Sequence, residues 1–282
     1  MTNPNEKAAH FLRAGVAHHA AGRLDQAEAH YRKALARAPG NVDALYLLAE
    51  IAAARGRANY AAQLAGKALA GKPDHAPALV LLGNIEWADG RRTEAIDRWR
   101  RAIAADPRNA PAHVNLALAY LDLNDAVAAE ASAAAAVAWE PTLARGHYAL
   151  AYARHLQGKL TKAESAYRTA MQFDPNSAVI LRDFGSLLAQ SKRAKEALEL
   201  QERALALAPR DALCLYAKAV TLTCLDENEA AEAFFVRSLE SNPESASAWT
   251  ARGANLRILG RFDQATDCFR RAVELDPQAA EA

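Results

Sequence analysis

Apolar and small residues recur along this chain with a period of 34 residues, and each period ends in a proline. A proline cannot continue a helix, because it lacks the backbone N–H and its ring clashes with the preceding turn. The prolines that keep this spacing are Pro39, Pro73, Pro107, Pro141, Pro175, Pro209, Pro243 and Pro277. Eight helix ends in one register predict eight copies of one helical unit.

The units are placed by taking each proline as position 32. They then span 8–41, 42–75, 76–109, 110–143, 144–177, 178–211, 212–245 and 246–279, with short tails at 1–7 and 280–282. Position 20 is alanine in every copy, from Ala27 to Ala265, and position 8 is always glycine or alanine. We interpret these two positions as opposite sides of one close contact between helices.

Turn and cap residues divide each unit into two helices. Position 15 is glycine in five copies, and glycine readily adopts the left-handed conformation that ends a helix. Good N-cap residues follow at position 18, where they predict the start of the second helix: Asp25, Asn59, Thr93, Thr161 and Asp263. Position 34 predicts caps for the next first helix, at Asn41, Asn109, Ser177, Asp211 and Ser245.

The pattern over 8–279 resembles the tetratricopeptide repeat (TPR). The last unit carries it most completely, with Trp249, Gly253, Leu256, Ala265, Phe269, Ala272 and Pro277. The resemblance implies an all-α fold, a right-handed α-solenoid (superhelix) of eight 34-residue helix-turn-helix units. It also implies that the first helices line a concave groove and that the second helices lie outside.

The charge of the chain argues against two classes of partner. Lys and Arg number 34 against 33 Asp and Glu, so no strong field attracts nucleic acid or an anionic membrane. No apolar run approaches the roughly 20 residues that span a bilayer. The cysteines Cys214, Cys224 and Cys268 are odd in number and lack metal-ligand spacing, which favours reduced thiols in a cytoplasmic protein.

Motifs of catalysis are missing from the sequence. It contains no nucleophile elbow, phosphate loop, HExxH or paired-cysteine motif. His113 and His147 recur one repeat apart, but further ligands for a metal are not evident, so packing is the favoured interpretation. We therefore expect no enzyme activity, no cofactor and no metal site.

The expected function lies in the groove that the resemblance implies, at positions 2, 5, 9 and 12 of each first helix. Rigid aromatic side chains there would anchor a peptide, amides would bond its backbone, and arginines would hold carboxylates. The candidate residues are Tyr46, Asn84, Trp87, Asn115, Arg145, Tyr148, Tyr152, His155, Arg182, Tyr216 and Arg257.

One known groove chemistry fits only in part. The TPR domains that hold chaperone C-termini use a carboxylate clamp of Lys, Asn, Asn, Lys and Arg, and Asn84 and Asn115 match its two asparagines. The basic positions of the clamp hold Val80, Tyr148 and Tyr152 instead. This departure argues against a chaperone tail as the ligand.

The last repeat leaves a second surface to explain. Phe269, Val273 and Leu275 would normally be covered by a further repeat, so we expect them to be open. A C-terminal segment, self-association through this end, or a tolerated exposed patch would each account for them.

Three functions follow in order of preference. The first is a non-catalytic scaffold or adaptor that binds a peptide segment of a partner protein in its groove. The second is the N-terminal substrate-recruiting arm of a larger enzyme, such as a glycosyltransferase, sulfotransferase or methyltransferase. The third, RNA binding, is disfavoured by the strict period of 34 and the near-neutral charge.

Overall fold

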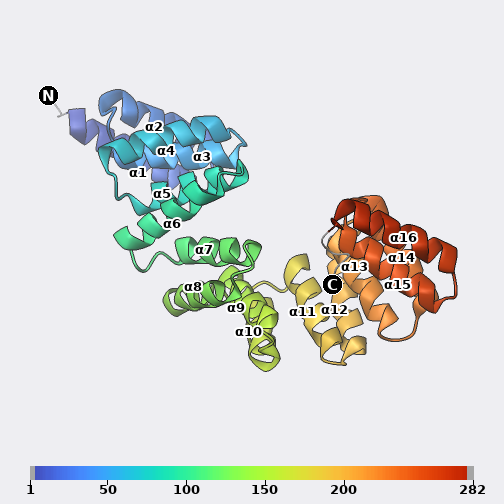
Figure 1. Ribbon diagram of the computed structural model, residues 1–282. Helices are drawn as coiled ribbons and strands as arrows, with labels where there is room; N and C mark the ends of the chain where they lie inside the picture. Colours follow the sequence, from blue (N-terminus) through green and yellow to red (C-terminus); the bar gives the residue numbers. More distant parts are fainter. Residues whose placement is uncertain (1–3, 278–282) are drawn as a thin grey trace. The chain divides into compact units, whose positions relative to one another are not determined.

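The computed structural model describes residues 4–277, and within that range every regular element is a helix (Figure 1). The chain divides into two compact units, Met1–Pro141 and Thr142–Ala282. Unit 1 contains α1 (Pro4–Ala20), α2 (Leu24–Arg37), α3 (Val42–Ala54), α4 (Ala58–Gly71), α5 (Ala76–Ala88), α6 (Arg92–Ala105), α7 (Ala110–Asp122) and α8 (Ala126–Trp139). Unit 2 contains α9 (Ala144–Leu156), α10 (Leu160–Phe173), α11 (Ala178–Gln190), α12 (Ala194–Leu207), α13 (Ala212–Thr223), α14 (Asn228–Ser241), α15 (Ala246–Ile258) and α16 (Phe262–Leu275).

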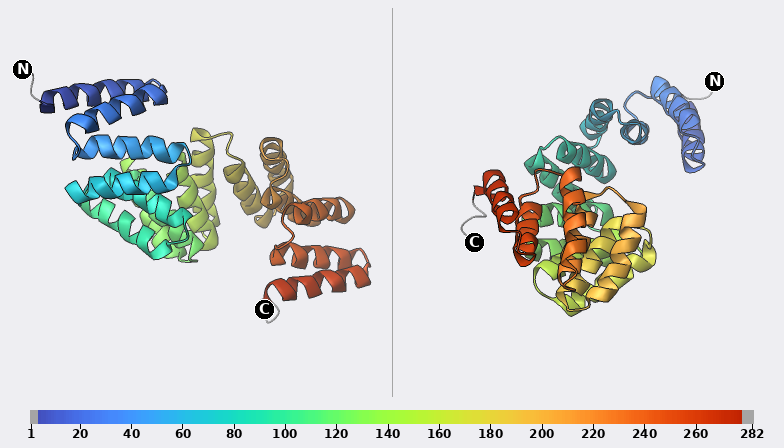
Figure 2. Two further views of the ribbon diagram at one scale, coloured as in Figure 1. Left: turned by 90° about the horizontal axis from the view of Figure 1, so that it is seen from above. Right: turned by 90° about the vertical axis from the view of Figure 1, so that its right-hand side faces the viewer.

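Each predicted repeat is one helical hairpin, and the hairpins can be followed in two further views (Figure 2). Within each unit, the second helix of a hairpin packs against the first helix of the next hairpin. Successive first helices are also in contact: α3 contacts α5, and α11 contacts α13. The prediction of an all-α helical repeat solenoid is confirmed.

The ends of the array differ slightly from the predicted boundaries. Helix α1 begins at Pro4, so residues 4–7 of the predicted N-terminal tail are helical. The predicted C-terminal tail, 280–282, lies outside the described residues.

Side-chain caps start most first helices as predicted, but among the described second helices only α8 has one, where Asp125 accepts the backbone N–H of Ala128. Asn41, Asn109, Asp211 and Ser245 each accept the backbone N–H three residues on, whereas Ser177 makes no such bond. The second helices begin earlier than predicted, with N-caps at position 16 such as Arg23 and Lys159, which make no side-chain cap bond.

The cap prediction at position 18 was therefore wrong. The residue at position 15 turns the chain with a positive φ, as in Gly22 at 72°, and the helix resumes two residues later. Asp25 consequently lies in the first turn of α2, where its charge interacts favourably with the helix dipole.

The small residue at position 8 makes room for the large side chain at position 24. A Cβ built on Gly83 would lie 2.6 Å from Nε1 of Trp99, and one built on Gly15 would lie 2.5 Å from Cε1 of Tyr31. The sequence predicts that position 8 contacts position 20 instead. The backbone at position 20 comes close in one repeat, where a Cβ built on Gly185 would lie 3.2 Å from the carbonyl oxygen of Ala197. The aromatic ring is the closer neighbour and thus the stronger reason for glycine.

The last hairpin only partly fits the expectation of an open end. Val273 is 44% exposed and Leu275 is half-buried. Phe269 is also half-buried, because its ring packs close to Gly253 and against the buried cluster of Leu256, Ala265 and Cys268. The expectation was wrong for Phe269, whose own hairpin covers part of its ring.

Candidate functional site

Each unit holds a cavity lined almost entirely by first helices, at the positions expected to face the groove. The unit 1 cavity, of about 350 Å³, is lined by Tyr46, Glu50, Pro77, Val80, Leu81, Asn84, Asn109 and Pro111. The unit 2 cavity, of about 300 Å³, is lined by Tyr152, His155, Leu156, Arg182, Asp183, Ser186, Leu213, Tyr216 and Ala217. Three successive first helices contribute to each cavity, α3, α5 and α7 in unit 1 and α9, α11 and α13 in unit 2.

Tyr152 of α9 lines the unit 2 cavity, and Tyr148 stacks on it from behind. Tyr148 and Tyr152 are four residues apart, so they lie on the same face of the helix. Their rings are nearly parallel, with an angle of 7° between the planes and centroids 6.1 Å apart. The Tyr148 ring also packs against the fully buried ring of Tyr167. This side of the cavity is therefore rigid.

An ion pair on α11 fixes the charge in this cavity. Nε and Nη2 of Arg182 donate to the two carboxylate oxygens of Asp183 at 2.6 and 2.9 Å. The Tyr148 hydroxyl donates to the same carboxylate at 2.9 Å. Burial and the nearby charge of Asp183 raise the pKa of Tyr148, so this hydroxyl stays a donor.

This ion pair changes the predicted role of Arg182. Burial alone would lower the pKa of the guanidinium, but its hydrogen bonds and charge contact with Asp183 raise it overall. The side chains of Arg182 and Asp183 are only 14% and 12% exposed. Because Asp183 already neutralises the cation, a carboxylate ligand would have to compete with Asp183 for Arg182.

The rest of the unit 2 cavity is aromatic or aliphatic. Nε2 of His155 lies 2.8 Å from Oε1 of Gln190, and the Tyr216 ring packs edge-on against Phe235. Burial raises the pKa of Tyr216. Leu156 and Leu213 are 50% and 52% exposed at the rim. The lining thus combines a neutralised ion pair with exposed apolar surface.

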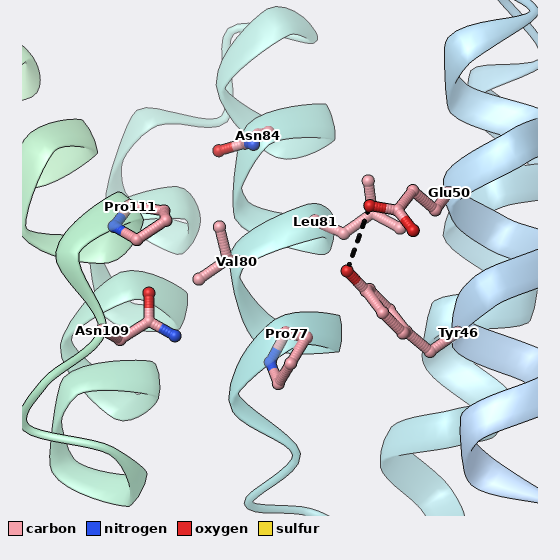
Figure 3. A pocket seen from close by; sticks show the side chains of 8 residues that line it. All are labelled: Tyr46, Glu50, Pro77, Val80, Leu81, Asn84, Asn109 and Pro111. Carbon is pink, nitrogen blue, oxygen red and sulfur yellow. Dashed lines mark hydrogen bonds between the residues drawn. The ribbon is translucent and has the colours of Figure 1, made fainter. Parts of the chain in front are cut away.

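The unit 1 cavity has a different lining (Figure 3). The Tyr46 hydroxyl donates to Oε1 of Glu50 at 3.3 Å, and both residues belong to α3. Burial, and then the charge and hydrogen bond of Glu50, raise the pKa of Tyr46. On α5, Leu81 lies beside Glu50, and Val80 lies on the side toward Asn109 and Pro111 (Figure 3).

The two asparagines predicted to bond a peptide backbone bond each other. Nδ2 of Asn115 donates to Oδ1 of Asn84 at 2.7 Å, and Nε1 of Trp99 donates to the same oxygen at 3.1 Å. Because the indole is a donor only, this contact fixes the orientation of the Asn84 amide. Its oxygen is occupied, and its NH2 group is left for other acceptors.

Five predicted residues line neither cavity: Asn115 and Tyr148, which contact residues that do, and Trp87, Arg145 and Arg257. The Trp87 ring packs 5.6 Å from Trp99, with the Arg92 guanidinium over its face at 5.3 Å. Arg145 and Arg257 are exposed. The structure therefore gathers Tyr46 and Asn84, with Asn115 bonded to Asn84, in unit 1. In unit 2 it gathers Tyr152, His155, Arg182 and Tyr216, with Tyr148 stacked behind.

The sequence places Glu50 at groove position 9 and Asp183 at position 6 on its edge, but neither is among the candidate residues named above. Asp183 follows Arg182 directly, so an acid next to a groove arginine was a visible signal. Among the described residues, no cluster of three histidine, cysteine or carboxylate side chains is arranged to hold a metal. Within the same range, no helix has both the length and the hydropathy to cross a bilayer.

Comparisons with protein families match four parts of the chain. Models described as TPR repeat or tetratricopeptide repeat match residues 18–64, 83–124, 144–177 and 246–278. This chain belongs to the tetratricopeptide repeat family. The predicted resemblance is confirmed, and its helical hairpins are TPR hairpins.

Solved TPR structures share the fold of this chain. The hetero-tetramer Cut9–Hcn1 of the APC/C is 16% identical over 89% of this chain and 50% of that chain, with a TM-score of 0.72. A TPR protein from Parabacteroides merdae is 14% identical over 95% of this chain and 99% of the other, with a TM-score of 0.60. A thermophilic TPR protein of Thermus thermophilus is 28% identical over 64% of this chain and 98% of the other, with a TM-score of 0.51.

One curated relative matches a short stretch of the sequence. Cell division cycle protein 27 homolog B of Arabidopsis thaliana is 39% identical over 69 residues. The match covers 24% of this chain and 9% of that protein.

Proposed function

We propose that this TPR protein is a non-catalytic scaffold that binds an extended segment of a partner protein in the unit 2 cavity. The observation that carries the proposal is the Tyr152 ring, with Tyr148 stacked behind it, beside half-exposed Leu156 and Leu213. Tyrosine offers a large contact area and loses little rotamer entropy on binding, so such a lining suits an apolar or aromatic side chain of the segment.

The polar groups of this cavity suit a peptide backbone better than a carboxylate. Arg182 uses Nε and Nη2 on Asp183, which leaves Nη1 to donate to a backbone carbonyl of the segment. Asp183 would repel a carboxylate placed beside it. The expected ligand therefore presents an uncharged, apolar anchor to this cavity.

The comparisons support the scaffold role at the level of fold. The similar Cut9–Hcn1 structure is an assembly of several chains, but a shared fold does not transfer a partner. The free thiols Cys214, Cys224 and Cys268 agree with the cytoplasm as the proposed location.

A phage-displayed library of random ten-residue peptides tests the proposal. Peptides selected by the wild-type protein are synthesised, and their affinities are measured by fluorescence anisotropy. Tyr152→Ala should weaken the peptides with apolar anchors roughly tenfold or more. Phe262→Ala is the matched control, because it removes a ring that is 66% exposed on α16, outside the cavity.

The double change Tyr148→Ala and Tyr152→Ala gives the larger contrast. Tyr148 also holds Asp183, so circular dichroism must first show that the variant is folded. If the folded double variant binds every selected peptide as the wild type does, the unit 2 cavity is not the binding site.

One observation supports the alternative function, in which this chain is the substrate-recruiting arm of a larger enzyme. Val273 on α16 is 44% exposed, as expected if further chain covers this face in a larger protein. Self-association through Phe269, Val273 and Leu275 would cover it as well. The intact mass of the native polypeptide separates the two: a mass well above 30.3 kDa favours the arm, and a dimer of 30.3 kDa chains favours self-association.

A further inference from the structure

Glu50 is a half-buried carboxylate without a cation to balance it. Within residues 6–277 it accepts one hydrogen bond, from the Tyr46 hydroxyl at 3.3 Å, and makes no ion pair. The other carboxylate on the groove side of α3, Asp43, lies 3.6 Å from Nε2 of His75. Glu50 thus differs from Asp183 of unit 2, whose charge Arg182 neutralises.

The first helices of repeats 2 to 4 supply no lysine or arginine on the groove side of Glu50. Positions 2, 5, 6, 9 and 12 of the first helices in repeats 2, 3 and 4 contain neither lysine nor arginine. None of the residues that line the unit 1 cavity is basic. A carboxylate at the edge of a cavity of about 350 Å³ is therefore open to a cation from outside.

The walls of the cavity suit the stem of a long basic side chain. On α5, Pro77 and Leu81 are nearer to Tyr46 and Glu50, and Val80 continues the apolar lining toward Asn109 and Pro111 (Figure 3). Lysine and arginine cover apolar surface with their methylene groups while the charged head reaches a polar partner. The Tyr46 ring beside the carboxylate adds an aromatic face for that cation.

Free amide groups on the far side suit the backbone of the same ligand. The Asn84 oxygen is occupied by Trp99 and Asn115, and the Asn109 oxygen accepts from the backbone N–H of Ala112. Both amides therefore have an NH2 group left to donate to peptide carbonyls. The arrangement combines an acceptor for a cation with donors for a backbone.

We infer that the unit 1 cavity binds a lysine or arginine side chain of a partner protein, with Glu50 as the acceptor of its charge. The site presupposes the proposed scaffold role, but it is separate from the unit 2 cavity. It would give this protein a preference for a basic residue that the chaperone-tail clamp, with its basic groove, does not have.

Peptides from the same random library, panned against the full chain, test this inference. The selected set should be enriched in lysine or arginine at one position. Glu50→Gln should weaken those peptides roughly tenfold or more, because a charge-assisted hydrogen bond is lost. Glu240→Gln on α14 is the matched control, since it makes the same change of charge at an exposed position outside both cavities.

A double-mutant cycle then identifies the pair of groups. Replacing the selected lysine by acetyl-lysine keeps the stem and removes the charge. The acetylated peptide should bind the wild type and Glu50→Gln with equal affinity. The affinity lost on acetylation and the affinity lost in Glu50→Gln should therefore not add. Fully additive losses, or equal effects of Glu50→Gln and Glu240→Gln, would overturn the inference.

The outcomes separate this inference from the proposed function. Peptides that depend on Tyr152 but show no enrichment of basic residues would overturn the inference and leave the scaffold role standing. A library from which no peptide is selected would contradict both.

Discussion

The two cavities use the same repeat positions but differ in how their charge is balanced. In unit 1, the Tyr46 hydroxyl is the one hydrogen-bond partner of Glu50, at position 9, among the described residues. In unit 2, Arg182 at position 5 is held by Asp183 at position 6, and Tyr148 bonds the same carboxylate. The repeat thus determines where a groove residue lies, while its immediate neighbours determine whether its charge is available to a ligand.

The core side chains at position 24, behind the two cavities, also differ in their hydrogen bonds. In repeat 3, Trp99 at position 24 donates to Asn84 and so connects the core to the cavity. In repeat 5, the hydroxyl of Tyr167 at position 24 is buried without a hydrogen-bond partner among the described residues. The core of unit 1 helps to orient a cavity residue, whereas in repeat 5 the core ring only packs.

The largest expected effect comes from removing the partner of Arg182. Asp183→Ala leaves a guanidinium whose side chain is 14% exposed without its counter-charge, and should lower the free energy of unfolding by about 3 kcal/mol. Urea unfolding followed by circular dichroism measures the change. Glu50→Ala should cost less than about 0.5 kcal/mol, because that carboxylate has no ion pair to lose. Equal losses for the two variants would erase the contrast between the cavities.

A smaller effect is expected where a glycine makes room for the ring behind the unit 1 cavity. Gly83→Ala places a methyl group 2.6 Å from Nε1 of Trp99, which must move and weaken its bond to Asn84. We expect a net loss of about 1–2 kcal/mol, since overpacking outweighs the better helix propensity of alanine. In Gly185→Ala the nearest side chain is the flexible Gln201, so urea unfolding should show a smaller loss.

One substitution should stabilise the protein. Tyr167→Phe removes the buried hydroxyl that has no partner in the described part of the chain and keeps the ring. The free energy of unfolding should rise by about 1 kcal/mol. The matched Tyr148→Phe removes a hydroxyl that bonds Asp183, and should lower it. A loss in both variants would mean that the Tyr167 hydroxyl does have a partner.

A further effect, which appears only outside the neutral range, is a loss of stability at high pH. Burial, and then the charge of Glu50, raise the pKa of Tyr31 from 10.0 to about 12. The contribution of protonated Tyr31 to the free energy of unfolding is therefore fully present below pH 10. It falls between pH 10 and about 12, because Tyr31 loses its proton at a lower pH in the unfolded chain than in the folded one. The urea midpoint should decline over this range, and Tyr31→Phe should reduce the decline. A midpoint that is constant up to pH 11 would contradict this.

The sequence predicted the architecture well because its signals are local and repeated. Prolines at fixed spacing, the position 34 caps and the small residues at position 8 each depend on a few neighbouring residues, and all agree in register. The groove positions followed from the same register, and both cavities are lined from them.

The chemistry of the cavities was harder to predict because it depends on rotamers. Whether Arg182 turns toward solvent or toward Asp183, and whether Asn84 meets a ligand or Asn115, is decided by packing across repeats. The second-helix caps were misplaced because the residues at position 18 are good caps, but the chain has already entered the helix two residues before them.

Methyl NMR of the leucine-labelled protein tests the central claim most directly, because each cavity contains leucines of its own. Leu156 and Leu213 line the unit 2 cavity, and Leu81 lines the unit 1 cavity. A peptide with an apolar anchor and no basic residue should shift the methyl signals of Leu156 and Leu213, and a lysine-containing peptide should shift those of Leu81. Shifts confined to the exposed Leu207 on α12, with all three cavity leucines unchanged, would contradict the account.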